Sequence, residues 1–136
     1  MISFNTTRRD ESSEGNDLYL SMLRHADVVI PIFSTMAIEA AIFDKPTVTI
    51  GFDGHKKRPA HQSITRLEQL AHFRHVLDIG SIKIARSFPE LFTTIREYLY
   101  NPEKDKEQRK DLVQKLCYRF DGKASERIAS AILRNL

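Results

Sequence analysis

The chain has 136 residues, of which 41% are hydrophobic and 29% charged, and it carries a net charge of +3 at neutral pH. This length fits a single domain, and the balance of apolar and charged residues excludes a wholly disordered or collagen-like protein. The sequence has no apolar run that could span a bilayer, no signal peptide and a single cysteine, Cys117, so we expect a cytoplasmic protein without an internal disulfide.

The start of the chain is polar, and the first helix is expected after it. Residues 1–16 combine serine, threonine and mixed charges, so we expect a flexible segment there and one domain over residues 17–136. Asp17 is suited to cap a helix over residues 18–25. The apolar side of this helix is expected to consist of Leu18, Met22 and Leu23.

A strand, a helix and a second strand are predicted next. The β-branched run at 27–30 is typical of a strand covered on both faces, and Pro31 ends it because proline has no N–H group to donate. Ser34 or Thr35 is expected to cap a helix that runs to about residue 43. A second strand over 47–52 completes a βαβ unit, so the two strands should be parallel.

The remainder of the chain alternates short strands with helices. A loop follows the second strand, and Ser87 with Glu90 forms a capping-box pattern with proline in the first turn of a helix. We expect a helix at 64–71, strands at 76–79 and 82–85, and helices from Ser87 to Asn101, at 103–118 and at 124–135.

These elements indicate an α/β fold: a Rossmann-like parallel sheet of three to four strands flanked by helices. A doubly wound sheet usually has more strands than this. We therefore interpret the chain as the second half of a nucleotide-binding domain, whose first strands lie elsewhere or are absent.

The loop before the helix at 35–43 is the first candidate site. In open parallel sheets, ligands bind at the carboxyl ends of the strands. Ser34 and Thr35 stand at a helix start, where free N–H groups favour an anion, and Glu39 lies about one turn further on the same face. A diphosphate there would place its ribose near the Glu39 carboxylate. The alternative is that Ser34 only caps the helix and Glu39 is solvated.

A basic stretch between His55 and His75 is the second candidate. The residues expected to contact an anionic ligand are Lys56, Lys57, Arg58 and His72. The alternative is a solvated loop and helix. The histidines show no zinc spacing, so we predict no metal site. Nucleic-acid binding is not expected, because Phe73 is the only aromatic residue available for stacking in this stretch.

The sequence also resembles a known superfamily. Residues 33–46 resemble the donor-nucleotide motif of GT-B-fold enzymes, which include nucleotide-sugar glycosyltransferases, UDP-N-acetylglucosamine 2-epimerases and CDP-glycerol glycerophosphotransferases. In that motif Ser34 and Thr35 match the residues over the diphosphate, Glu39 matches the ribose ligand, and Lys45-Pro46 matches the turn into the next strand. Residues 98–102 and 121–129 resemble the C-terminal region of the same enzymes.

The resemblance implies the donor-binding, C-terminal half of a GT-B transferase of surface-polysaccharide or teichoic-acid-like polymer synthesis. Thr35-Met36 replaces the glycines of the epimerases, which favours a transferase. The expected ligand is a UDP- or CDP-activated donor, and no cofactor is expected. The catalytic base of such enzymes lies on the N-terminal domain, so we expect no turnover by this chain alone.

The sequence also leaves one alternative function open and predicts self-association. The chain could be a non-catalytic α/β binding module, paired with an N-terminal half on another chain. A sheet that lacks its leading strands also has an open edge and exposed apolar surface, from which we expect a homodimer.

Overall fold

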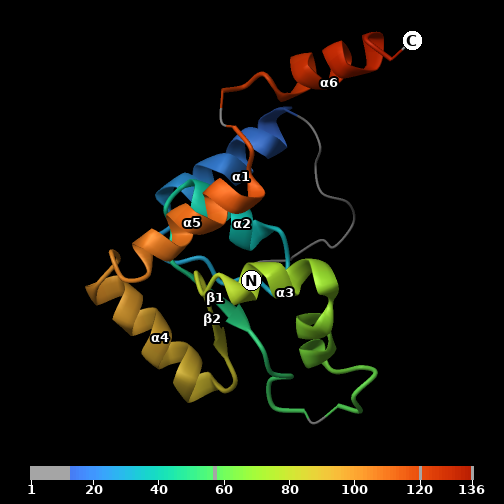
Figure 1. Ribbon diagram of the computed structural model, residues 1–136. Coiled ribbons are helices and arrows are strands. Elements are labelled where there is room, and N and C mark those ends of the chain that lie inside the picture. Colours follow the sequence, from blue (N-terminus) through green and yellow to red (C-terminus); the bar gives the residue numbers. More distant parts are fainter. Residues whose placement is uncertain (1–12, 57, 120, 136) are drawn as a thin grey trace.

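The computed structural model describes residues 13–56, 58–119 and 121–135, except for the side chains of Ser13 and His72. This part of the chain contains six α-helices, a 3-10 helix and a small sheet, arranged as in Figure 1. In chain order the elements are α1 (Ser13–His25), α2 (Met36–Ile42), β1 (Thr47–Ile50), η1 (Ile64–Gln69), α3 (Ala71–Asp78), β2 (Ile82–Ala85), α4 (Phe88–Tyr100), α5 (Lys106–Leu116) and α6 (Ala124–Leu133).

The sheet has two parallel strands, with Thr47 of β1 opposite Ile82 of β2. The run at 27–30 adds an isolated parallel bridge between Val29 and Thr47 rather than a regular strand. Three backbone hydrogen bonds still join residues 29–31 to residues 46–50, among them the bond from the Val48 N–H to the Val29 carbonyl at 3.0 Å. The fold is therefore α/β as expected, but within the described residues the sheet is smaller than the three to four strands predicted.

The strand predicted at 76–79 is wrong, because these residues belong to the last turns of α3 and the residues after it. Phe73 and Val76 are three positions apart and both are buried in one cluster. That spacing brings two side chains to one side of a helix but to opposite faces of a strand. The buried cluster therefore favours the helix over the β-branched composition of the run.

Helices cover both faces of the sheet. On one face α4 packs against the strands, with Leu91 beside Val48 and Ala85. On the other face lies the largest cluster of buried residues, which joins α2, α3, α5 and β2; its members are Phe33, Ala37, Ala41, Phe73, Val76, Ile82 and Leu112. Alanines on α2 have small side chains, so α1 and α5 can both lie close to this helix (Figure 1).

The expected helix starts are confirmed in part. The Ser87 hydroxyl accepts a hydrogen bond from the Glu90 N–H, which begins α4, while the Glu90 carboxylate accepts from the Arg86 N–H at 2.7 Å. In α1 the expected apolar side is wrong, because Leu18 and Met22 are each 65% exposed and Leu23 is buried. Tyr19, one turn before Leu23, packs on the same buried cluster instead.

The last helix differs from the others. None of the α6 side chains is buried, and Figure 1 shows the helix at the edge of the molecule, away from the sheet. Among the described helices, none is long and apolar enough to cross a membrane.

Candidate functional site

Ser34, Thr35 and Glu39 line one pocket of about 360 Å³. Its remaining lining residues are Met36, on the first turn of α2, and Tyr19, which reaches the pocket from α1. The structure therefore brings together the three residues that the helical spacing grouped, and it adds a residue from a neighbouring helix.

The hydroxyl groups at the start of α2 do not cap the helix, contrary to the expectation. The Thr35 carbonyl accepts from the Ile38 and Glu39 N–H groups at 2.9 and 3.1 Å, and the Ser34 carbonyl accepts from the Ala37 N–H. The Thr35 hydroxyl makes no cap bond. Within the part of the chain that the structure describes, neither this hydroxyl nor that of Ser34 has a hydrogen-bond partner, so both are available to a bound molecule.

Glu39 is held by Tyr19. The Tyr19 hydroxyl donates a hydrogen bond to Oε2 of the half-buried Glu39 carboxylate. A carboxylate has acceptor capacity beyond one such bond, so the group can still accept hydroxyls from a ligand. Sequence reasoning missed Tyr19; its place one turn before Leu23, on the buried side of α1, was the available signal.

The basic loop lies apart from this pocket's lining. Lys56 and Arg58 are exposed and are not among the residues that line the pocket. Lys57 lies outside the described residues, and so does the His72 side chain, so the structure does not place these two candidates.

The ends of the basic loop are fixed by polar and aromatic contacts. The Asp53 carboxylate accepts from the Ile64 N–H at 2.7 Å, and this bond, together with Ser63, holds the pKa of Asp53 below its ordinary value. The His55 ring stacks on Phe88, with ring centroids 4.7 Å apart. These contacts hold both ends of the loop, while the Lys56 and Arg58 side chains are exposed to solvent.

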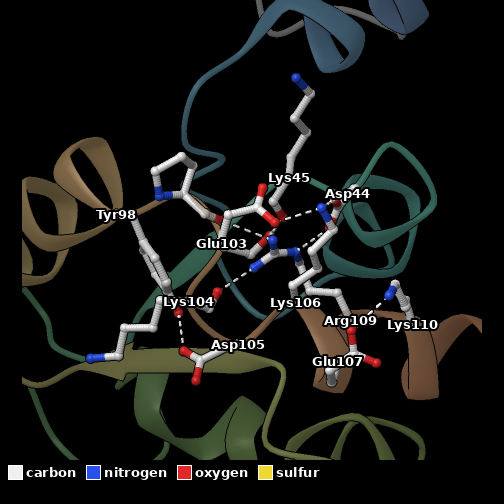
Figure 2. A network of polar contacts seen from close by, with 12 residues as sticks. Asp44, Lys45, Tyr98, Glu103, Lys104, Asp105, Lys106, Glu107, Arg109 and Lys110 are labelled. Atoms are coloured by element: carbon white, nitrogen blue, oxygen red, sulfur yellow. Dashed lines mark hydrogen bonds and ion pairs between the residues drawn. The ribbon is translucent and has the colours of Figure 1, made fainter.

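A second polar cluster surrounds Arg109, at the other end of α2 (Figure 2). The Arg109 side chain is only 2% exposed, and its Nε donates to Asp44 Oδ1 at 2.8 Å. Its Nη1 and Nη2 donate to the carbonyls of Lys104 and Pro102 at 2.6 and 2.9 Å. The guanidinium thus joins the end of α2 to the loop between α4 and α5.

Asp105 extends this cluster toward the sheet. Its carboxylate accepts from the Tyr98 hydroxyl at 2.9 Å and lies 3.3 Å from Lys83 Nζ of β2. Burial, and then the hydrogen bond to Asp105, raises the pKa of Tyr98. Asp44 and Asp105 both have positive φ, at 54° and 59°, a conformation that aspartate adopts more readily than most residues.

Sequence reasoning missed the Arg109 cluster because Arg109 lies in a highly charged helix. Leu112, three positions later, is fully buried, so the two residues share the side of α5 that faces α2. The three-residue spacing between Arg109 and Leu112 was the signal that could have revealed the cluster. The donors of the cluster are used within the protein, which makes it a structural connection rather than a binding site. Among the described residues, no group of three or more histidine, cysteine or acidic side chains is placed to hold a metal ion.

Comparison with known proteins gives one match. The family model of CDP-glycerol:poly(glycerophosphate) glycerophosphotransferase matches residues 9–134. No curated protein and no solved structure matches the chain.

Proposed function

Because the chain belongs to the CDP-glycerol:poly(glycerophosphate) glycerophosphotransferase family, we propose that it binds a CDP-activated donor in the pocket of Ser34, Thr35 and Glu39. The family is one of transferases, and its name supplies the class of donor and acceptor. The observation that carries the proposal is a single pocket lined by one oriented carboxylate and by two hydroxyls that have no hydrogen-bond partner among the described residues.

Each group in the pocket has a role that fits its chemistry. The hydroxyls of Ser34 and Thr35 donate to the oxygens of the diphosphate. Glu39 accepts from the ribose hydroxyls, while Tyr19 keeps the carboxylate in one orientation. This arrangement binds and positions the donor, and it stabilises the charge that grows on the leaving phosphate.

The reaction that follows from the family is glycerophosphate transfer. A hydroxyl of the growing polymer attacks the phosphorus that carries glycerol, the bond from that phosphorus to the bridging oxygen breaks, and CMP leaves with the electron pair. The hydroxyl proton passes to a base. We propose that a separate, N-terminal domain supplies this base, with the present chain acting as the C-terminal, GT-B-type donor half in the cytoplasm.

The alternative is a non-catalytic binding module with the same pocket. The two readings differ in turnover when the chain is supplied with a partner domain. Release of CMP from CDP-glycerol by the complex supports the transferase, whereas donor binding without CMP release supports the module.

The pocket is tested by thermal shift with CDP, UDP, CDP-glycerol and glycerol 3-phosphate. Since the donor binds only the folded chain, CDP-glycerol at about 100 times its Kd should stabilise it by about 2.7 kcal/mol. Glu39→Gln should remove most of this shift. The matched control is Glu107→Gln on the exposed side of α5, which should keep it. An equal shift in wild type and Glu39→Gln would remove Glu39 from the site.

Self-association also stays a prediction. Large apolar side chains are exposed on α1 and on α6, including Leu18, Met22, Ile128 and Leu133. Contact between such surfaces would favour a dimer. Sedimentation across the micromolar range measures it, and a monomer throughout that range would contradict the prediction.

A further inference from the structure

Outside the donor pocket, a basic concavity is formed by α6 and the segment before it. A pocket of about 800 Å³ opens there, and four of its lining residues are cationic: Arg119, Lys123, Arg127 and Arg134. Two acidic residues, Asp121 and Glu126, also line it. The surface is therefore net positive.

The turn before α6 fixes the shape of this surface. Asp121 Oδ1 accepts from the Lys123 N–H at 3.0 Å, and both carboxylate oxygens lie 2.8 Å from Nη1 of Arg127. The Arg127 bond, and then the Lys123 bond, lowers the pKa of Asp121, so the carboxylate stays ionised and holds the turn at neutral pH. Gly122, at φ 70°, supplies the backbone conformation that the turn requires.

The aromatic ring of Tyr118 lies beside two of these cations. The guanidinium carbons of Arg119 and Arg127 lie 4.9 and 5.7 Å from the centre of its ring, at cation–π distance. Among the described residues, no carboxylate lies within ion-pair distance of Arg119, Lys123 or Arg134. Arg119, Lys123 and Arg134 therefore line one concavity without an acidic partner in the described part of the chain.

The spacing of the cations along α6 suits an extended ligand. Lys123, Arg127 and Arg134 are four and seven positions apart, so they form one row with steps of about 6 and 10 Å. Because Arg127 already pairs with Asp121, the free charges of the row are those of Lys123 and Arg134, about 16 Å apart along the helix. A single phosphate would meet one of them. A chain of phosphodiesters could reach both, and its affinity would come mainly from the release of counterions.

The apolar residues of α6 lie on a different side of the helix from the basic row. Ile128 and Ile132 lie about 140° to 180° around the helix from Lys123. Helices in membrane interfaces show the same division into a basic and an apolar side, so a lipid surface is the competing partner that the test must separate.

We propose that the basic row of α6, together with Arg119 of the same concavity, binds the phosphodiester backbone of the acceptor polymer, at a site separate from the donor pocket. This assignment rests on the proposed function for the identity of the polymer, because poly(glycerophosphate) is the acceptor in the family's name. The row holds the growing chain by its charge, several units away from the end that reacts.

The test uses the full chain and a fluorescent oligomer of glycerol phosphate, with binding measured over a series of salt concentrations. The variant is Arg119→Gln/Lys123→Gln/Arg134→Gln, which leaves the Arg127–Asp121 bond intact. The control, Arg96→Gln/Lys110→Gln/Lys115→Gln, removes the same charge from exposed positions of α4 and α5. We expect the slope of log affinity against log salt to fall by about 2 to 3 in the variant, with the control close to wild type.

Three results would overturn the proposal: equal oligomer binding by variant and wild type, an equal loss in the control, or binding to phosphatidylglycerol vesicles without binding to the oligomer. Donor binding is measured separately in the same preparations, by the thermal shift with CDP-glycerol. The α6 variant should keep that shift. If wild type shows oligomer binding but no donor shift, the proposed function fails while the basic row stands as a polyanion site.

Discussion

The two ends of α2 carry polar clusters of opposite character. At its C-terminal end, Arg109 donates to Asp44 and to two carbonyls, so its charge is satisfied inside the protein. At its N-terminal end, the hydroxyls of Ser34 and Thr35 line a pocket and have no partner in the described part of the chain. The hydrogen bonds at the C-terminal end stabilise the fold, whereas the hydroxyls at the N-terminal end remain available to a ligand. The comparison predicts that mutations at the first end change stability, whereas mutations at the second change binding.

The largest effect is expected from Arg109→Met. The substitution leaves Asp44 and the carbonyls of Pro102 and Lys104 without their donor, and it should lower the free energy of unfolding by about 3 kcal/mol. Urea denaturation measures this loss. Arg96→Met, on the exposed side of α4, is the control and should change stability by less than about 0.5 kcal/mol. Comparable values for the two variants would mean that the cluster does not hold α2 in place.

Tyr19→Phe tests the other end of α2. Without the hydroxyl, the Glu39 carboxylate loses the donor that orients it, and CDP-glycerol affinity should fall about 3- to 10-fold, a cost of about 1 kcal/mol. Calorimetric titration measures the affinity. Tyr100→Phe, at an exposed position of α4, should bind the donor like wild type. Unchanged affinity in Tyr19→Phe would show that Glu39 needs no support from α1.

A smaller and pH-dependent effect is expected at the ion pair of Glu68 and Arg86, whose two hydrogen bonds measure 2.6 and 2.7 Å. The hydrogen bond from Arg86 lowers the pKa of Glu68. A carboxyl with a lowered folded-state pKa stabilises the protein above its unfolded pKa, and the contribution is lost as pH falls through the folded value. Because the pair is partly exposed, Glu68→Gln should cost about 0.5 kcal/mol at neutral pH.

The same variant should cost less in acid, because protonation of Glu68 removes the contribution of the ion pair. Urea denaturation near pH 7 and near pH 3 should show a smaller difference between wild type and Glu68→Gln at the lower pH. A larger stability difference near pH 3 than near pH 7 would contradict this prediction.

The smallest effect concerns the basic loop. Because Lys56 and Arg58 do not line the donor pocket, we expect them to attract the donor at a distance, and Lys56→Ser/Arg58→Ser should weaken binding about twofold. Donor titration at low and high salt measures this, and the difference should disappear at high salt. A larger loss that persists in salt would mean that the loop contacts the donor directly.

The fold was predictable where the pattern was local. The helices α2, α4, α5 and α6 and the strands β1 and β2 all fall within predicted elements, since caps, breaks and periodicity mark them in the sequence. The run at 76–79 was not predictable in this way, because a short apolar run is compatible with both helix and strand. Its helix follows from packing against Phe33 and Leu112, which are distant in sequence.

In the candidate site, too, the residues close in sequence could be predicted and the long-range pairs could not. Ser34, Thr35 and Glu39 could be grouped because one turn of helix separates them. Tyr19 lies 20 positions from Glu39, and Asp44 lies 65 positions from Arg109. Such pairs form only when separate helices pack together, and no local pattern records them. Long-range partners of this kind therefore require the structure.

The isolation of α6 affects its dynamics. The helix has ten residues and no buried side chain, and a helix of this length is marginal in water without tertiary packing. Its amide hydrogens should exchange with solvent far faster than those of β1, whose side chains are mostly buried. A polymer that binds the row formed by Lys123, Arg127 and Arg134 needs α6 to be folded as a helix. Its apparent affinity is therefore the intrinsic affinity multiplied by the fraction of molecules in which α6 is folded. Protection of the α6 amides from exchange would then rise with the length of the bound polymer.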